Sequence, residues 1–185
     1  MSNLVIFLGP PGAGKGTQAA KISKEKNLAH ISTGDMLREH VSNGTELGNM
    51  AKTLLDQGKL VPDSLVIEML IERLNSDDCK NGAILDGFPR TIAQAESLDE
   101  ISNQFKISKV IVFDANHEEL VRRILYRGET SGRSDDTEES ISVRLKVYEL
   151  DTAPLIDHYK QKNLVVDINA IGEVDNIYNL ILGEF

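Results

Sequence analysis

Short runs of apolar residues recur along the chain, and most of them are continuous rather than alternating with polar residues. Each run is rich in β-branched or large apolar residues and is bounded by polar residues or glycine. Continuous runs of this length are typical of strands covered on both faces, as in a parallel sheet. The predicted strands are Leu4 to Leu8, Ala83 to Leu85, Val110 to Phe113 and Leu164 to Ile168, with Leu28 to Ser32 as a weaker fifth candidate.

Between these runs, apolar residues follow helical spacing. Ser64 to Leu74 keeps an apolar stripe, and Asp63 or Pro62 stands where a cap or a first-turn residue belongs. Strands alternating with such helices predict an α/β fold with right-handed crossovers. The same spacing predicts helices at Glu118 to Arg127, Glu138 to Lys160 and Glu173 to Leu182.

Two stretches fit this alternation poorly. Thr33 to Leu60 is helical in pattern but lies between two predicted strands, and Gly128 to Asp136 is polar and contains glycine. We expect both to be excursions from the carboxyl ends of strands, where α/β proteins build their sites.

Composition narrows the class of protein. With 185 residues, one domain is expected. The net charge of −9 argues against a surface that grips nucleic acid. The single Cys79 excludes an intramolecular disulfide framework and a four-cysteine zinc site. The first apolar run is too short to span a bilayer and lacks the basic start of a signal peptide, so a soluble cytoplasmic protein is expected.

A glycine-rich motif, Gly9-Pro-Pro-Gly-Ala-Gly-Lys-Gly-Thr17, follows the first predicted strand and opens a helix from Gln18 to Lys26. This is the setting that a phosphate-binding loop requires, because backbone N–H groups, the helix N-terminus and Lys15 all favour anions. Gly16 stands where the usual motif has Ser or Thr, so the motif alone leaves metal ligation by a hydroxyl open. The Asp-x-x-Gly and Asn-Lys-x-Asp motifs of GTPases are absent from the sequence. The candidate classes that remain are ATP-using kinases and other phosphate-loop proteins.

Arginines stand at predicted turns and strand ends. Transfer between two phosphates requires planar, permanently charged donors, and a phosphate acceptor needs no general base. The histidines are scattered and read as structural or surface residues (His30, His40, His117 and His158), and Arg73 and Arg122 read as solvated. We expect six arginines to act together on phosphates: Arg38, Arg90, Arg123, Arg127, Arg133 and Arg144.

Four motifs together resemble the adenylate kinase family of nucleoside monophosphate kinases: residues 9–17, Ser-Thr-Gly-Asp-Met-Leu-Arg at 32–38, Asp-Gly-Phe-Pro-Arg at 86–90, and Arg-Gly-Glu-Thr-Ser-Gly-Arg at 127–133. The resemblance covers essentially the whole chain, and Gly-Thr after Lys15 is normal for the family. It implies a phosphate-loop core with a five-stranded parallel sheet flanked by helices. The core would be residues 1–31, 62–125 and 137–185, with a helical NMP-binding insertion at 32–61 and a short lid at 126–136.

The resemblance also implies an activity, the reversible transfer of a phosphoryl group from MgATP to AMP to give two ADP, and a set of site residues. Lys15, Arg90, Arg127, Arg133 and Arg144 would be catalytic. Asp86 would hold magnesium through water, no zinc is expected, and Asp135 and Asp136 would orient the lid arginines. ATP would contact Gly12, Ala13, Gly14, Lys15, Gly16, Thr17, Arg123, Arg127 and Gly172. AMP would contact Thr33, Arg38, Lys59, Leu60, Val61, Gly87, Phe88, Pro89, Arg90, Gln94, Arg133 and Arg144.

Two alternatives stay open. A UMP/CMP kinase of this family typically has Ala at the place of Thr33 and Asn at the place of Gln94, so both residues favour AMP. A non-catalytic nucleotide sensor would need the loss of one catalytic charge, and all of them are present. The expected partners are ATP, AMP and ADP, with no nucleic acid or membrane, and a monomer is the family expectation.

Overall fold

The computed structural model describes residues 2–101, 104–131, 133 and 135–185. Its centre is a five-stranded sheet in which all neighbouring strands are parallel, in the order β2-β3-β1-β4-β5. The prediction of an α/β fold with a parallel sheet is therefore confirmed, and each apolar run of the sequence lies largely or wholly within a strand. The strands are β1 (Ser2–Leu8), β2 (Ala29–Ser32), β3 (Ala83–Asp86), β4 (Phe105–Asp114) and β5 (Val165–Asn169).

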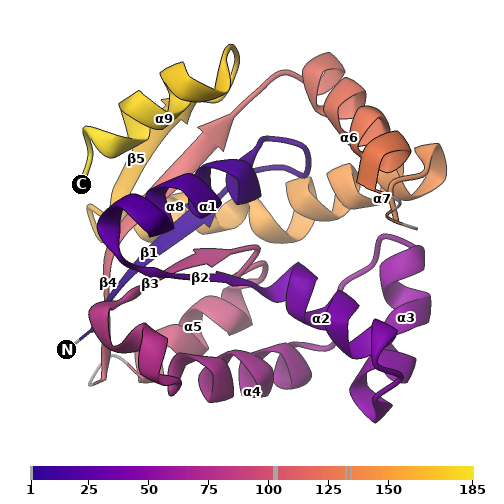
Figure 1. Ribbon diagram of the computed structural model, residues 1–185, viewed down its shortest axis with the longest axis horizontal. Helices are drawn as coiled ribbons and strands as arrows, with labels where there is room; N and C mark the ends of the chain where they lie inside the picture. Colours follow the sequence, from indigo (N-terminus) through magenta and orange to yellow (C-terminus); the bar gives the residue numbers. More distant parts are fainter. Residues whose placement is uncertain (1, 102–103, 132, 134) are drawn as a thin grey trace.

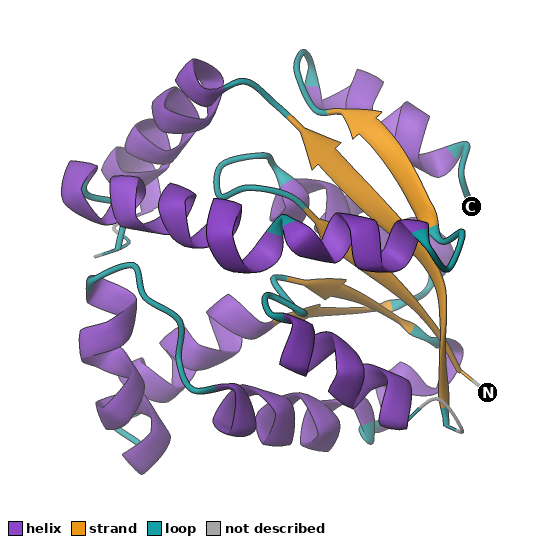
Figure 2. Cartoon of the chain, turned by 180° about the vertical axis from the view of Figure 1, so that it is seen from behind, coloured by secondary structure: helices purple, strands orange, loops and turns teal. Residues whose placement is uncertain are grey.

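Helices cover both faces of the sheet (Figures 1 and 2). They are α1 (Lys15–Lys26), α2 (Thr33–Ser42), α3 (Glu46–Asp56), α4 (Asp63–Leu74), α5 (Ile92–Glu100), α6 (His117–Ser131), α7 (Glu138–Val147), α8 (Pro154–Lys160) and α9 (Val174–Leu182). A 3-10 turn covers Asp77–Asn81 and a π turn covers Tyr148–Thr152. None of the helices in the described part of the chain is long and apolar enough to cross a membrane.

The alternation of side chains along β1 divides the core in two. Leu4, Ile6 and Leu8 pack on one face with buried residues of α4, α5 and α8. Val5 and Phe7 pack on the other face with buried residues of α1, α6, α7 and α9. Both faces of the strand are therefore apolar, which is why its sequence reads as a continuous run.

The polar stretch after Arg127 differs from its prediction. We expected a loop from Arg127 to Asp136, but α6 continues to Ser131, so the loop prediction is wrong for its first half. Gly128 is not a turn residue: a Cβ built on it would lie 2.9 Å from the backbone oxygen of Asp136. The absence of a side chain at Gly128 allows the returning chain to approach α6 closely, and α6 passes through this glycine without ending. Residues 132 and 134 of the predicted lid lie outside the described residues.

The long helix predicted from Glu138 to Lys160 is interrupted. α7 ends at Val147, a π turn follows, and α8 begins at Pro154. Proline lacks the N–H that would bond the carbonyl four residues earlier, and its ring clashes with that carbonyl, so the backbone widens before it. In this turn the Thr152 hydroxyl donates to the carbonyl of Arg90 (2.8 Å), which joins the turn to the segment between β3 and α5.

The two excursions from the sheet lie opposite each other at one end of the molecule (Figures 1 and 2). The first, as expected, is helical and consists of α2 and α3. The second consists of the end of α6 and the segment that leads into α7. The carboxyl ends of β1, β2 and β3 point toward the space between them, because parallel strands end at the same edge of the sheet.

Candidate active site

A cavity of about 530 Å³ lies at this edge of the sheet, between the two excursions. The phosphate loop between β1 and α1 forms one wall of it. There Lys15 donates hydrogen bonds from Nζ to the carbonyls of Gly9 (2.7 Å) and Pro10 (2.8 Å). Burial lowers the pKa of Lys15 to about 8; the Asp86 carboxylate opposes this effect, and nearby guanidinium groups, Arg90 first, add to it. The ammonium is thus held where an anion would stabilise its charge.

Gly16 is explained by its neighbour on β3. A Cβ built on Gly16 would lie 3.1 Å from Oδ2 of Asp86, closer than most such contacts in proteins. A serine or threonine at this position would therefore crowd the carboxylate. The departure from the usual phosphate-loop motif makes room for Asp86, and the hydroxyl of Thr17 follows one residue later along the cavity wall.

Guanidinium groups from separate segments converge on the cavity. They belong to Arg38 on α2, Arg90 after β3, Arg127 on α6, Arg133 before α7, and Arg144 on α7. Burial and the neighbouring Arg144 lower the pKa of Arg90 to about 10, which leaves it charged at neutral pH. Such a concentration of half-buried positive charge suits a ligand with several phosphate oxygens.

Carboxylates hold four of these five arginines in place. Asp136 accepts two hydrogen bonds from Arg127 (both 2.7 Å) and one from Arg144 (2.7 Å). Asp35 accepts from Arg38 (2.6 Å) and from Arg133 (3.0 Å). Although burial raises the pKa of both carboxyl groups, hydrogen bonds and charges from their arginine partners lower it below the usual value.

Two ion pairs join the two excursions. Asp35 of α2 contacts Arg133, and Arg38 of α2 lies 3.6 Å from Asp135, which precedes α7. The prediction that Asp135 and Asp136 are partners of the arginines agrees with this geometry. Each excursion contributes one acid and one base to the contact, so the pairing is reciprocal.

The end of the cavity next to α4 and α5 carries uncharged polar groups. The Thr33 hydroxyl and Nε of Arg90 both donate to the carbonyl of Gly87, each at 2.8 Å. The Gln94 side chain is only 2% exposed. It accepts from the backbone N–H of Arg90 (2.8 Å) and donates to Asp63 (2.7 Å). These groups can read the edge of a ligand, because each is fixed by a partner and faces the cavity.

Most of the predicted site residues line this one cavity, but a few lie elsewhere. Phe88 and Ala13 are buried in the two cores, each 1% exposed. Arg123 donates to Glu119 (2.6 Å) and to the Ala170 carbonyl (3.0 Å), so it lies beside the segment that leads to Gly172. The cavity is lined by Gly12, Gly14, Lys15, Gly16, Thr17, Thr33, Arg38, Lys59, Leu60, Val61, Asp86, Gly87, Pro89, Arg90, Gln94, Arg127, Arg133 and Arg144.

Sequence reasoning missed three polar residues of the site. His30, which we read as structural or surface, lines the cavity with its Nε2 3.4 Å from Asp86. Asp35 was seen only as part of a motif, and Asp63 only as a possible helix cap. For His30 a signal existed, since it lies two residues before the end of a predicted strand. Asp63 acts through residues far along the chain, which no local pattern reveals.

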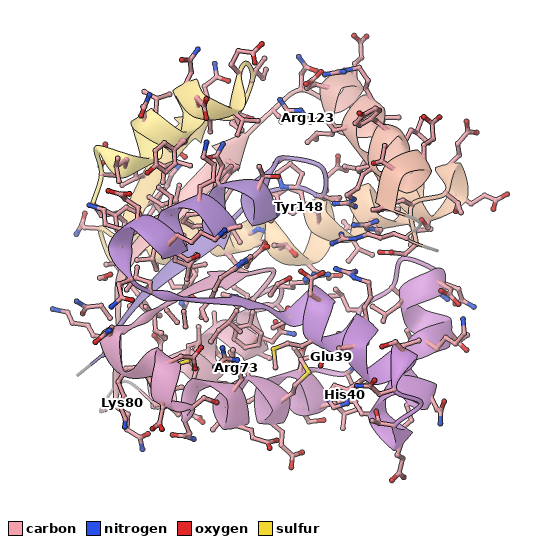
Figure 3. All side chains as sticks on the ribbon, viewed as in Figure 1. Glu39, His40, Arg73, Lys80, Arg123 and Tyr148 are labelled. Atoms are coloured by element: carbon pink, nitrogen blue, oxygen red, sulfur yellow. The ribbon has the colours of Figure 1, made fainter. Side chains whose placement is uncertain are left out.

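The two arginines read as solvated, Arg73 and Arg122, do not line the cavity. Arg122 pairs with Glu119 on the surface of α6, and Arg73 pairs with Asp78 (2.6 Å). Figure 3 shows Lys80 far from the end where α6 and α7 face α2 and α3, whereas Arg123 lies on α6. The interpretation of Arg73 and Arg122 as outside the site agrees with these positions.

Comparison with known proteins gives a consistent result. A family model described as Adenylate kinase matches residues 7–164. The protein named Adenylate kinase of Leptospira biflexa is 50% identical over 180 residues, covering 96% of this chain and 97% of that protein. Its namesake in Archaeoglobus fulgidus is 44% identical over 206 aligned residues (96% and 95%). The one in Phocaeicola vulgatus is 48% identical over 180 residues (96% and 95%).

Proposed function

The chain belongs to the adenylate kinase family and transfers a phosphoryl group from ATP to AMP; on this premise we propose a role for each part of its cavity. One observation carries the proposal: the phosphate loop, converging arginines and the buried amide of Gln94 line the same cavity. A phosphate donor and a base-bearing acceptor can therefore meet there with their phosphates among the guanidinium groups.

The donor ATP occupies the phosphate-loop side. Backbone N–H groups from Gly12 to Thr17 surround its phosphates, and the Lys15 ammonium follows the transferred group. Arg127 binds the same phosphates. The adenine lies outside the enclosed cavity, against Arg123 and the backbone of Gly172. The hydrogen bond from Arg123 to the Ala170 carbonyl supports this placement, because it holds Arg123 beside the segment that leads to Gly172.

Magnesium would accompany the donor, and Asp86 would hold it through water. The carboxylate fits this task, since it is half-buried at the end of β3 and lies against Gly16 of the phosphate loop. A single carboxylate is enough, because Mg²⁺ keeps several waters and takes further ligands from phosphates. When bound, the ion neutralises charge on the transferred and adjacent phosphates.

The acceptor AMP occupies the side next to α2 and α3. Arg38 and Arg90 bind its phosphate, and the segment from Lys59 to Val61 lies along its base. Thr33 and Gln94 read the base. The Thr33 hydroxyl donates its proton to the Gly87 carbonyl, so its oxygen is free to accept from the adenine amine.

Transfer proceeds in line between the two phosphates. The attacking oxygen belongs to a phosphate that is already ionised, so the chain needs no general base. Five cationic groups stabilise the charge that spreads over the transferred group: Lys15, Arg90, Arg127, Arg133 and Arg144. Carboxylates keep Arg127, Arg133 and Arg144 in position, whereas backbone carbonyls hold Lys15 and Arg90. The chemistry is positioning and electrostatic stabilisation without a covalent intermediate.

The regions 32–61 and 126–136 close over the nucleotides during transfer and exclude water. The reciprocal contacts Asp35–Arg133 and Arg38–Asp135 support this role, since they join the two regions across the cavity. Exclusion of water prevents hydrolysis of ATP.

The cavity brings the proposed donor and acceptor sites together within one chain. We therefore propose that the protein acts as a monomer. We also propose that it acts in the cytoplasm, because the free Cys79 is buried and suits a reducing compartment.

A coupled assay of ADP formation from MgATP tests the proposal, with AMP, CMP, UMP and GMP compared as acceptors. We expect a strong preference for AMP. A preference for CMP or UMP would keep the arginine roles and overturn the base-reading roles of Thr33 and Gln94. Binding of ATP without transfer to any acceptor would identify a nucleotide sensor instead.

A further inference from the structure

The side-chain amide of Gln94 is held in one orientation by two partners. Its Oε1 accepts from the backbone N–H of Arg90 at 2.8 Å, and its Nε2 donates to Oδ1 of Asp63 at 2.7 Å. Gln94 is 2% exposed, so water cannot replace either partner at low cost. The orientation of this amide is therefore a built feature of the cavity.

The chemistry of the two partners leaves the amide no alternative. A carboxylate only accepts hydrogen bonds, and a backbone N–H only donates them. If the amide were flipped, its oxygen would face the Asp63 carboxylate and its NH₂ group would face the Arg90 N–H. Both hydrogen bonds would be replaced by repulsive contacts in a buried site, which makes the flipped state unfavourable.

Asp63 is itself fixed by a third residue. Its Oδ2 accepts from the hydroxyl of Thr91 at 3.0 Å. The same hydroxyl accepts from the backbone N–H of Gln94 at 3.2 Å, where it caps α5. Asp63, Thr91 and Gln94 thus form a closed network that ties the first turn of α4 to the first turn of α5.

Gln94 keeps one N–H and one oxygen lone pair that the network does not use. Adenine offers its N1 as an acceptor beside the N6 amine as a donor, whereas a 6-oxopurine offers an N1–H donor beside the O6 acceptor. An amide can match either edge, but only by reversing its two ends. The orientation of Gln94 therefore decides which purine it can bind.

We propose that Asp63 is a specificity-determining positioning residue, which fixes the Gln94 amide so that the acceptor base is adenine rather than a 6-oxopurine. The inference rests on the proposed function of Gln94 as a reader of the AMP base. Asp63 touches neither substrate in this account and acts through Gln94.

The test is the ratio of kcat/KM for AMP to that for IMP, whose base carries the 6-oxopurine edge without an added amine. In Asp63→Asn the side chain keeps its shape but can present either N–H or oxygen to Gln94. We expect the ratio to fall about tenfold, the value of a buried hydrogen bond to a charged group. The KM for ATP should not change. Glu68→Gln, an exposed carboxylate on the same helix, is the matched control and should leave the ratio as it is.

A second variant addresses the same network without altering Asp63. Thr91→Val removes the hydroxyl that fixes the carboxylate and should lower the ratio by a smaller factor, whereas Thr91→Ser should restore it. If Asp63→Asn and Thr91→Val lower all activities alike and the ratio changes less than twofold, Asp63 is only a stabiliser of the helix start and the inference is overturned.

Gln94→Ala separates this failure from failure of the proposed function. If Gln94→Ala leaves the ratio unchanged, Gln94 does not read the base and the proposed function is wrong at that residue. If Gln94→Ala changes the ratio but Asp63→Asn does not, only the present inference fails. In the double variant Asp63 should have no further effect on the ratio, because its influence passes through the amide.

Discussion

The two ends of the site are built in opposite ways. At the AMP end, Thr33 and Gln94 are each 2% exposed and already engaged in hydrogen bonds. At the ATP base end, Arg123 and Gly172 lie outside the enclosed cavity, and a Cβ built on Gly172 would meet no atom within 4 Å. A buried polar group rejects a mismatched ligand strongly, whereas an exposed one can turn to water. The acceptor base should therefore be selected more strictly than the donor base.

Between the two ends lies a region that belongs to neither base. There the side chains are charged, and their partners are other charged side chains: Asp136 with Arg127 and Arg144, and Asp35 with Arg38 and Arg133. Each of these groups is held by a charged partner from the chain itself, which favours electrostatic stabilisation of the transferred phosphoryl group without large rearrangement of the side chains. The comparison predicts that changes in this central region alter the rate, while changes at the ends alter the choice of nucleotide.

The largest effect is expected from the central region. Arg133→Ala should lower kcat by about 10³-fold, as for other arginines that stabilise phosphoryl transfer. The KM values for ATP and AMP should change far less, because Arg133 reads no base. Steady-state kinetics with both substrates measures this. Arg122→Ala, which removes a surface arginine paired with Glu119, is the control and should retain its rate. A loss below tenfold in Arg133→Ala would remove Arg133 from the catalytic set.

The sequence predicted the phosphate loop better than the network around Gln94, for a physical reason. The phosphate loop lies within one short segment, and its strand and helix have local patterns of their own. The continuous run around β1 likewise follows from burial on both faces. The network of Asp63 is different, because its partners stand 28 and 31 residues away and meet only after α4 and α5 pack. In isolation Asp63 reads as a helix cap.

In the segment after Arg127, by contrast, a local sequence pattern leads to a wrong prediction. Glycine beside polar residues is typical of a loop, and yet α6 continues through Gly128. The glycine is needed because the backbone of Asp136 returns against it. That approach follows from the pairing of Arg127 with Asp136, which is a tertiary contact and cannot be read from composition.

A smaller effect is expected from pH, and only at the ATP side. The pKa of Lys15 is lowered to about 8, first by burial, so this lysine loses its proton as pH rises through 8. Bound phosphates favour the protonated form and raise that pKa. ATP binding should therefore take up a proton above pH 8, and the Kd for MgATP should rise about tenfold between pH 7 and pH 9.

Calorimetry at several pH values, in buffers of different ionisation enthalpy, measures both the Kd and the proton uptake. Lys24→Met, an exposed lysine on the same helix, should leave the profile unchanged. AMP binding should vary less over this range, because its phosphate meets Arg38 and Arg90, and even the lowered pKa of Arg90 is about 10. A flat profile for ATP would mean that Lys15 does not bind its phosphates.

The smallest effect, and the one that separates the two ends most directly, is expected from Arg123→Ala. Loss of a partly exposed guanidinium stacked on adenine should raise the KM for ATP about three- to fivefold, as for a cation–π contact near the surface. The KM for AMP and the AMP-to-IMP ratio should not change. Because a guanidinium can stack on any base, the wild-type protein should discriminate ATP from GTP as donors far less than AMP from IMP as acceptors. Two results would contradict this contrast. If Arg123→Ala altered the choice of acceptor, the two ends would not be independent. If the protein discriminated between donors as strictly as between acceptors, the buried Gln94 amide would not make the AMP end more selective than the ATP end.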